Sequence, residues 1–191
     1  MHNKFNFFIM KKNILIFGLI SGLIVTAMMT ASVISCYKTQ EFEGNMILGF
    51  TVMIIAFAFI FVAIKNYRDK FNEGAVSFGK AFKIGMLITL IASTLYVVAW
   101  LIIYYNFFPD FMDKFTAHEI DQIKSKGYSV TETNEKIADL NSMKEMYRNP
   151  IVVVLYTYLE IFPVGLIITL ISAFFLKRKH KPAGFAPKIT G

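Results

Sequence analysis

Residues 151–176 read IVVVLYTYLEIFPVGLIITLISAFFL, an apolar run in which Glu160 is the one charged residue. A hydrocarbon core about 30 Å thick is crossed by roughly 20 apolar residues of α-helix. Inside a bilayer the chain must satisfy its own backbone hydrogen bonds, which favours a helix over irregular structure. This stretch therefore predicts a transmembrane helix.

Three further stretches are apolar and contain no charged residue at all: residues 13–37, 45–64 and 84–108. The chain has 191 residues and 55% hydrophobic content, so four spans and their connections use nearly all of it. We therefore predict an all-α membrane protein in which residues 10–179 form one four-helix transmembrane domain.

The N-terminus has some features of a secretory signal, because Lys11 and Lys12 precede an apolar run. The run from Ile14 to Cys36 is longer than the roughly 7–15 residues of a signal core, and further spans follow it, so we expect it to remain as a membrane helix. Met10 begins a credible translation start, and we interpret residues 1–9 as a dispensable extension.

Basic residues gather on alternate sides of the four spans. The N-terminal segment, the second loop and the tail carry Lys4, Lys11, Lys12; Lys65, Arg68, Lys70, Lys80, Lys83; and Lys177, Arg178, Lys179, Lys181, Lys188. The first loop has only Lys38 against Glu41 and Glu43, and the loop 109–150 has six basic and eight acidic residues. By the positive-inside rule, both termini are predicted to face the cytoplasm.

Other features of the composition exclude some functions. Most of the excess positive charge lies at span ends, where topology explains it, so the net charge of +7 does not predict nucleic-acid binding. Cys36 is the only cysteine, so no intrachain disulfide can form. The segment 180–191 is predicted to be a disordered cytoplasmic tail.

The loop 109–150 has a helical pattern. Phe111, Phe115, Ile120 and Ile123 recur at roughly helical intervals before Gly127, which predicts a first helix and its end. A second helix begins where Ser129 and Glu132 fit a capping box, and its apolar stripe consists of Ile137, Leu140, Met143 and Tyr147. We predict an external helical hairpin that lies on the membrane or caps the bundle; the alternative is a plain solvated connector.

Small residues recur at every fourth position on the first, third and fourth spans, and they include Gly18, Gly22, Gly85 and Gly165. Helices in lipid associate through close backbone approach at such residues. The pattern predicts a compact bundle, although one of these faces could instead serve a homodimer. The second span carries mainly bulky apolar residues, and we expect it to be the span that faces lipid most.

Glu160 is the only ionisable acid or base well inside a span, on the order of 14 Å along the helix from the external end. A charged carboxylate at that depth costs about 2.5–3.5 kcal/mol, so we expect Glu160 to be protonated and to face the bundle. No Lys, Arg or His lies in any predicted span to pair with it. The polar partners predicted at a similar depth are Thr30, Tyr96, Thr157 and Tyr104.

Pro163 follows in the same helix and cannot donate a hydrogen bond to the carbonyl of Leu159. A freed carbonyl beside a carboxyl resembles the broken helices that bind ions in transporters. The candidate intramembrane polar site therefore consists of Glu160, Pro163, Tyr96 and Thr30. It has two interpretations: a hydrogen bond that sets helix register, or a site for a proton, a cation or an amine.

Aromatic residues mark the ends of the spans. Tyr104, Tyr105, Phe107 and Phe108, with Tyr37 and Tyr156, are typical of an interfacial aromatic belt. In the second loop, Phe78 and Phe82 are one helical turn apart beside Lys80 and Lys83, a pattern typical of an interfacial lead-in to a span. Binding of anionic lipid there is an alternative to topology alone.

Sequence motifs give enzymatic activity little support. His2, His118 and His180 are far apart in the chain, and no HExxH, GxSxG or phosphate-loop motif occurs. We expect no catalytic residue, no metal site and no cofactor.

Four motifs occur in a characteristic order: Lys11-Lys-Asn13 before a glycine-rich span, Ser77-Phe-Gly-Lys-Ala-Phe82, Met143-Lys-Glu-Met-Tyr-Arg-Asn-Pro150, and Glu160-Ile-Phe-Pro-Val-Gly165. In order and spacing the chain after Met10 resembles the bacterial membrane proteins of domain-of-unknown-function family 4199. The resemblance implies a four-helix protein of the bacterial inner membrane with no established activity, and it assigns no functional residue.

Two functions remain as hypotheses. The first is a structural or accessory membrane component that packs with itself or with a partner in the bilayer. The alternative is a small proton- or cation-linked carrier or switch that uses Glu160 and the kink at Pro163.

Overall fold

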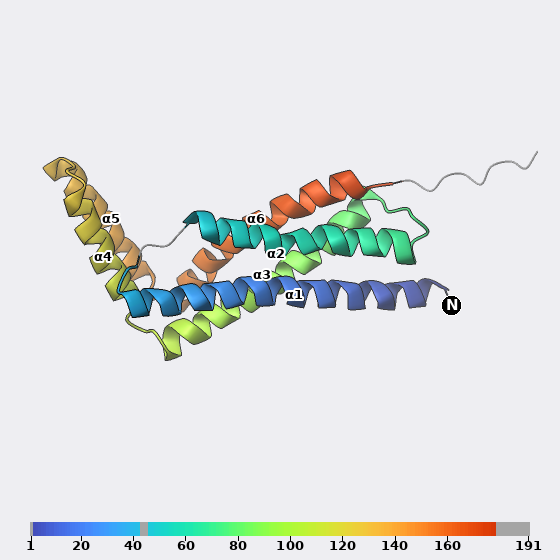
Figure 1. Ribbon diagram of the computed structural model, residues 1–191, viewed down its shortest axis with the longest axis horizontal. Coiled ribbons are helices and arrows are strands. Elements are labelled where there is room, and N and C mark those ends of the chain that lie inside the picture. The colour runs from blue at the N-terminus through green and yellow to red at the C-terminus, as the bar shows by residue number, and fades with distance from the viewer. Residues whose placement is uncertain (1, 43–45, 179–191) are drawn as a thin grey trace, which may run out of the picture.

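The computed structural model describes residues 2–42 and 46–178, and Figure 1 shows this part of the chain as an elongated helical bundle with a hairpin at one end. Its α-helices are α1 (His2–Thr39), α2 (Met46–Asn66), α3 (Phe78–Asn106), α4 (Phe111–Ser125), α5 (Val130–Met146) and α6 (Pro150–Leu176). A π-helical turn, Tyr67–Phe71, extends α2. The all-α prediction is confirmed.

Four segments are long and apolar enough to cross a membrane: Met10–Thr39, Met46–Phe71, Phe78–Asn106 and Pro150–Leu176. They correspond to the four predicted spans. The third begins earlier than predicted, because Ser77 caps the helix by accepting a hydrogen bond from the Lys80 amide. The helix α1 begins at His2, and the predicted tail 180–191 lies outside the described residues.

The spans pack so that α2 and α3 each contact both α1 and α6. The N-terminal end of α1 and the C-terminal end of α6 lie at the same end of the bundle, opposite the hairpin (Figure 1). Polar side chains help to join neighbouring helices. From α1, Asn13 donates to the Ala63 carbonyl at 2.9 Å and Ser21 donates to the Ala56 carbonyl at 2.8 Å.

The expectation that the second span faces lipid most is wrong, because a smaller share of the first span is buried than of the second. Phe57, Ile60 and Ile64 of α2 are fully buried, because both α1 and α6 pack against this helix. Bulky side chains therefore fill the centre of the bundle here. Composition alone did not distinguish a bulky face in contact with protein from one in contact with lipid.

The predicted hairpin is present as α4 and α5. Gly127 adopts a left-handed backbone with φ +69° between the two helices, a conformation that glycine accepts at no steric cost. Ser129 and Glu132 form the predicted capping box. Lys144 of α5 pairs with Asp113 of α4 at 2.6 Å, and no residue of α5 is buried.

The base of the hairpin is tied to the end of α1. The Tyr37 hydroxyl donates to Oδ1 of Asp110 at 2.6 Å, and Lys114 pairs with Oδ2 of the same residue at 2.9 Å. The hydroxyl of Tyr37, and then the ammonium group of Lys114, hold the pKa of Asp110 below its ordinary value. A cluster around Trp100, Tyr104 and Met112 packs beneath this junction.

Candidate functional site

The candidate site is built on a contact between α3 and α6. The hydroxyl of Tyr96 donates a hydrogen bond to Oε1 of Glu160 at 3.1 Å. Tyr96 is only 6% exposed and belongs to the central core, so its ring cannot change position without repacking. Glu160 is ten residues after Pro150, the first residue of α6, which places it about 15 Å along the helix.

Glu160 is more exposed than expected. Glu160 as a residue is exposed, although its hydrogen-bond donor is buried. Among the described residues, Tyr96 is the one side chain that donates to this carboxyl group. The hydrogen bond from Tyr96 reaches only one of the two carboxyl oxygens.

Tyr147 also lies in the electrostatic field of Glu160. It caps the end of α5, and its ring centroid is 6.0 Å from that of Tyr156 and 6.1 Å from that of Tyr104. Burial and, after it, the negative charge of Glu160 raise the pKa of Tyr147 to about 12. Sequence reasoning did not connect Tyr147 with Glu160; its position just before the last span was the only available signal.

The other members of the predicted site have different surroundings. The hydroxyl of Thr30 donates to the Thr26 carbonyl one turn earlier in α1, at 2.8 Å. This bond stays within one helix, so the inclusion of Thr30 in the site stays a prediction. Thr157, one turn before Ile161 in α6, likewise donates within its own helix to the Val153 carbonyl at 2.7 Å.

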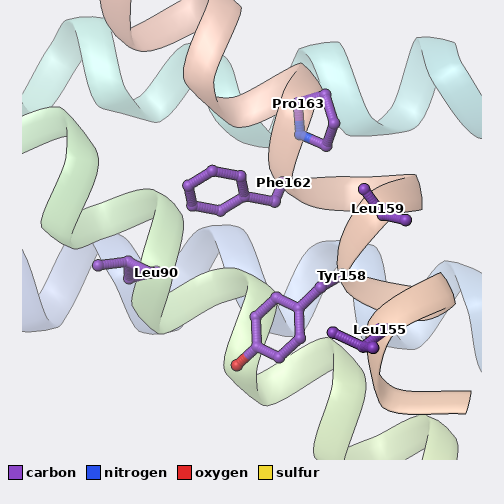
Figure 2. A pocket seen from close by; sticks show the side chains of 6 residues that line it. All are labelled: Leu90, Leu155, Tyr158, Leu159, Phe162 and Pro163. Carbon is purple, nitrogen blue, oxygen red and sulfur yellow. The ribbon is translucent and has the colours of Figure 1, made fainter. Parts of the chain in front are cut away.

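Pro163 lines a shallow groove between α3 and α6. Figure 2 shows Leu90 of α3 facing the α6 side chains across this groove. The groove has a volume of about 280 Å³ and is lined by Leu90, Leu155, Tyr158, Leu159, Phe162 and Pro163. At its edge the hydroxyls of Tyr158 and Thr94 are 2.8 Å apart and hydrogen bonded. Glu160 is not one of the lining residues.

The four packing glycines lie at close helix contacts. A Cβ atom on Gly18 would be 2.9 Å from Ile91, and one on Gly22 would be 2.9 Å from Leu95, both on α3. A Cβ atom on Gly85 would be 2.7 Å from Thr169, and one on Gly165 would be 2.5 Å from Thr89. Such contacts are shorter than van der Waals packing allows, so side chains of the neighbouring helix occupy the space that a Cβ atom would need.

The described residues contain no group of three or more His, Cys, Asp or Glu that could hold a metal ion. The chemistry available around Glu160 is that of one carboxyl group and several phenols. Such a set can form hydrogen bonds or attract a cation.

Comparison with known proteins identifies a family without adding an activity. A family model described as a protein of unknown function (DUF4199) matches residues 16–178. No curated protein and no solved structure matches the chain.

Proposed function

We propose a function for this chain, which belongs to the DUF4199 family of proteins of unknown function. The proposal is that it is a non-enzymatic accessory component of the bacterial inner membrane. In this proposal it associates with itself or with another membrane protein through the face of α6 that carries Glu160. The exposure of Glu160 is the observation that supports this proposal, because the residue lies inside a candidate span.

The energetic reason is the cost of a polar group in hydrocarbon. A carboxylate at the bilayer centre costs about 2.5–3.5 kcal/mol on insertion scales, and a neutral carboxyl group still lacks hydrogen-bond partners there. Tyr96 supplies one hydrogen bond. A polar group on a neighbouring protein would satisfy the rest, and interhelical hydrogen bonds of this kind contribute to helix association.

Cross-linking tests this proposal. Ile167 is 56% exposed and lies seven residues, or two turns, beyond Glu160 on α6. In a Cys36→Ala background, Ile167→Cys is expected to form specific cross-links in native membranes, either to a second copy or to one partner. Ile55→Cys is the matched control, because Ile55 is 57% exposed on the different helix α2. Equal cross-linking at both positions would contradict the proposal.

The proposed orientation places both termini in the cytoplasm. It is supported by the basic residues of the N-terminal segment, the second loop and the tail. A cysteine at Lys126, an exposed residue at the end of α4, is therefore expected to react with a membrane-impermeant reagent in intact spheroplasts. A cysteine at Lys83 is expected to react only after lysis, and the reverse pattern would overturn the orientation.

A second candidate function is a proton- or cation-linked carrier or switch. The observation that favours it is the hydrogen bond from the buried Tyr96 to the carboxyl group of Glu160, an exposed residue. A carboxyl group on such a residue can exchange a proton or bind a cation, while Tyr96 holds it in place. Pro163 would help by weakening the α6 backbone next to Glu160.

A further inference from the structure

Three segments that are distant in sequence converge at the end of the bundle opposite the hairpin. The backbones of Val76 and Arg178 form two hydrogen bonds of 2.9 and 2.8 Å, which place the residues before α3 against the end of α6. The guanidinium group of Arg68 donates to the Leu176 carbonyl at 3.4 Å. The π-helical turn after α2 therefore lies against the same end of α6.

The segments that meet here carry basic side chains at the same end of the bundle. The ammonium group of Lys80 lies 5.0 Å from the ring centroid of Tyr67 in the π-helical turn. Arg178 is held by the backbone bridge, and Lys177 precedes it. We call Lys80, Lys177 and Arg178 the basic junction. All three are exposed, and no ion pair of theirs occurs in the described part of the chain.

Nearby acidic groups only partly offset the charge of the basic junction. Asp69 forms an ion pair with Arg68 at 2.6 Å, and its negative charge also acts on Arg178. Glu73, the other acid of the second loop, is exposed and has a left-handed backbone with φ 53°. The junction therefore retains a local excess of positive charge.

Aromatic rings place the basic junction at the level of the membrane surface. Phe78 is 41% exposed and its ring stacks on that of Phe82 at a centroid distance of 6.1 Å. The ammonium group of Lys177 lies 4.2 Å from the ring centroid of Phe174. Exposed rings beside ammonium groups at a span end are suited to the boundary between acyl chains and headgroups.

We propose that the basic junction binds the phosphate of an anionic phospholipid, with the ring of Phe78 against its acyl chain. A lipid suits this surface better than a free phosphate ion, because the charges adjoin exposed aromatic rings. The positive-inside rule requires basic residues somewhere near this end of the bundle. It does not require that the segment before α3 and the end of α6 be joined by a backbone bridge beside these side chains.

The test uses the full chain in mild detergent micelles and short-chain phosphatidylglycerol as the probe, with the thermal unfolding midpoint as the readout. The wild type is expected to be stabilised in a saturable manner, and phosphatidylcholine of the same chain length is expected to have little effect. Each basic residue near an anionic headgroup contributes about a fivefold change in affinity. Lys80→Gln combined with Arg178→Gln should therefore weaken binding about 25-fold.

Control variants separate a specific site from general attraction. Lys124→Gln with Lys126→Gln, on the hairpin, is expected to bind as the wild type does. Lys65→Gln with Lys70→Gln removes two positive charges near the same end of the bundle. An equal loss of lipid affinity in this variant would mean that binding is diffuse electrostatic attraction and not a property of the basic junction. Equal stabilisation by inorganic phosphate would also overturn the proposal. Lys80→Arg with Arg178→Lys preserves both charges and should retain binding, which guards against a loss caused by misfolding.

Discussion

Replacing Gly165 with alanine is expected to destabilise the protein through a steric contact that costs about 1–3 kcal/mol of the free energy of unfolding, the usual cost of overpacking a core. The new Cβ atom would lie 2.5 Å from Cγ2 of Thr89 and 2.9 Å from Cζ of Phe57. Both neighbours are fully buried, and the Thr89 hydroxyl is hydrogen bonded to that of Thr169 at 3.1 Å. Denaturant unfolding in mild detergent, followed by circular dichroism, measures the loss.

Gly49→Ala is the matched control. Gly49 also lies in a candidate span, but a Cβ atom there would meet nothing within 4 Å. Alanine favours a helix over glycine by about 1 kcal/mol at either position, so the difference between the two variants isolates the contact of α6 with α2 and α3. If Gly165→Ala were as stable as Gly49→Ala, the close approach at this crossing would have no energetic importance.

Replacing Glu160 with leucine is expected to reduce the specific cross-linking at position 167 about tenfold. That factor corresponds to the loss of an interhelical hydrogen bond of roughly 1–2 kcal/mol in a bilayer. Glu160→Gln should keep most of the cross-linking, because an amide both donates and accepts hydrogen bonds. The measurement is the cross-linked fraction in native membranes, normalised to protein abundance.

The same two variants separate the proposed function from its alternative. A carrier or switch that needs a titrating carboxyl group loses its activity in Glu160→Gln, while its folding and abundance stay intact. In cells that need this protein, wild-type behaviour of Glu160→Gln would rule out the carrier. Loss of abundance in both variants would instead assign Glu160 a role in folding. Tyr96→Phe removes only the buried hydroxyl that donates a hydrogen bond to Glu160. It tests how far the role of the Glu160 carboxyl group depends on that hydrogen bond.

Much of the fold was predictable from local patterns. Runs such as residues 151–176 predicted helices because their length and lack of charge match a bilayer core. The hairpin was predictable because helix capping by Ser129 and Glu132 and the turn at Gly127 involve only residues a few positions apart in the chain. These preferences do not depend on the rest of the chain.

The candidate site was only partly predictable. Glu160 stood out because any acid inside an apolar run does, and Tyr96 could be selected by depth. The position of Tyr147 beside the rings of Tyr104 and Tyr156 could not be read from the sequence, because it depends on how the end of α5 meets α3 and α6. The basic junction was hidden for the same reason, since Val76 and Arg178 meet only when α3 and α6 are packed together.

The sequence by itself determined that this chain has four apolar spans, a charge asymmetry across them and a polar interruption at Glu160. Transfer of a residue into hydrocarbon and the placement of charge are properties of short segments, so they can be read locally. Only the tertiary structure decided that α2 is buried on one face, that Tyr96 meets Glu160 and that Glu160 stays exposed. Those outcomes depend on which helix faces contact one another. The packing of all four spans together determines these contacts.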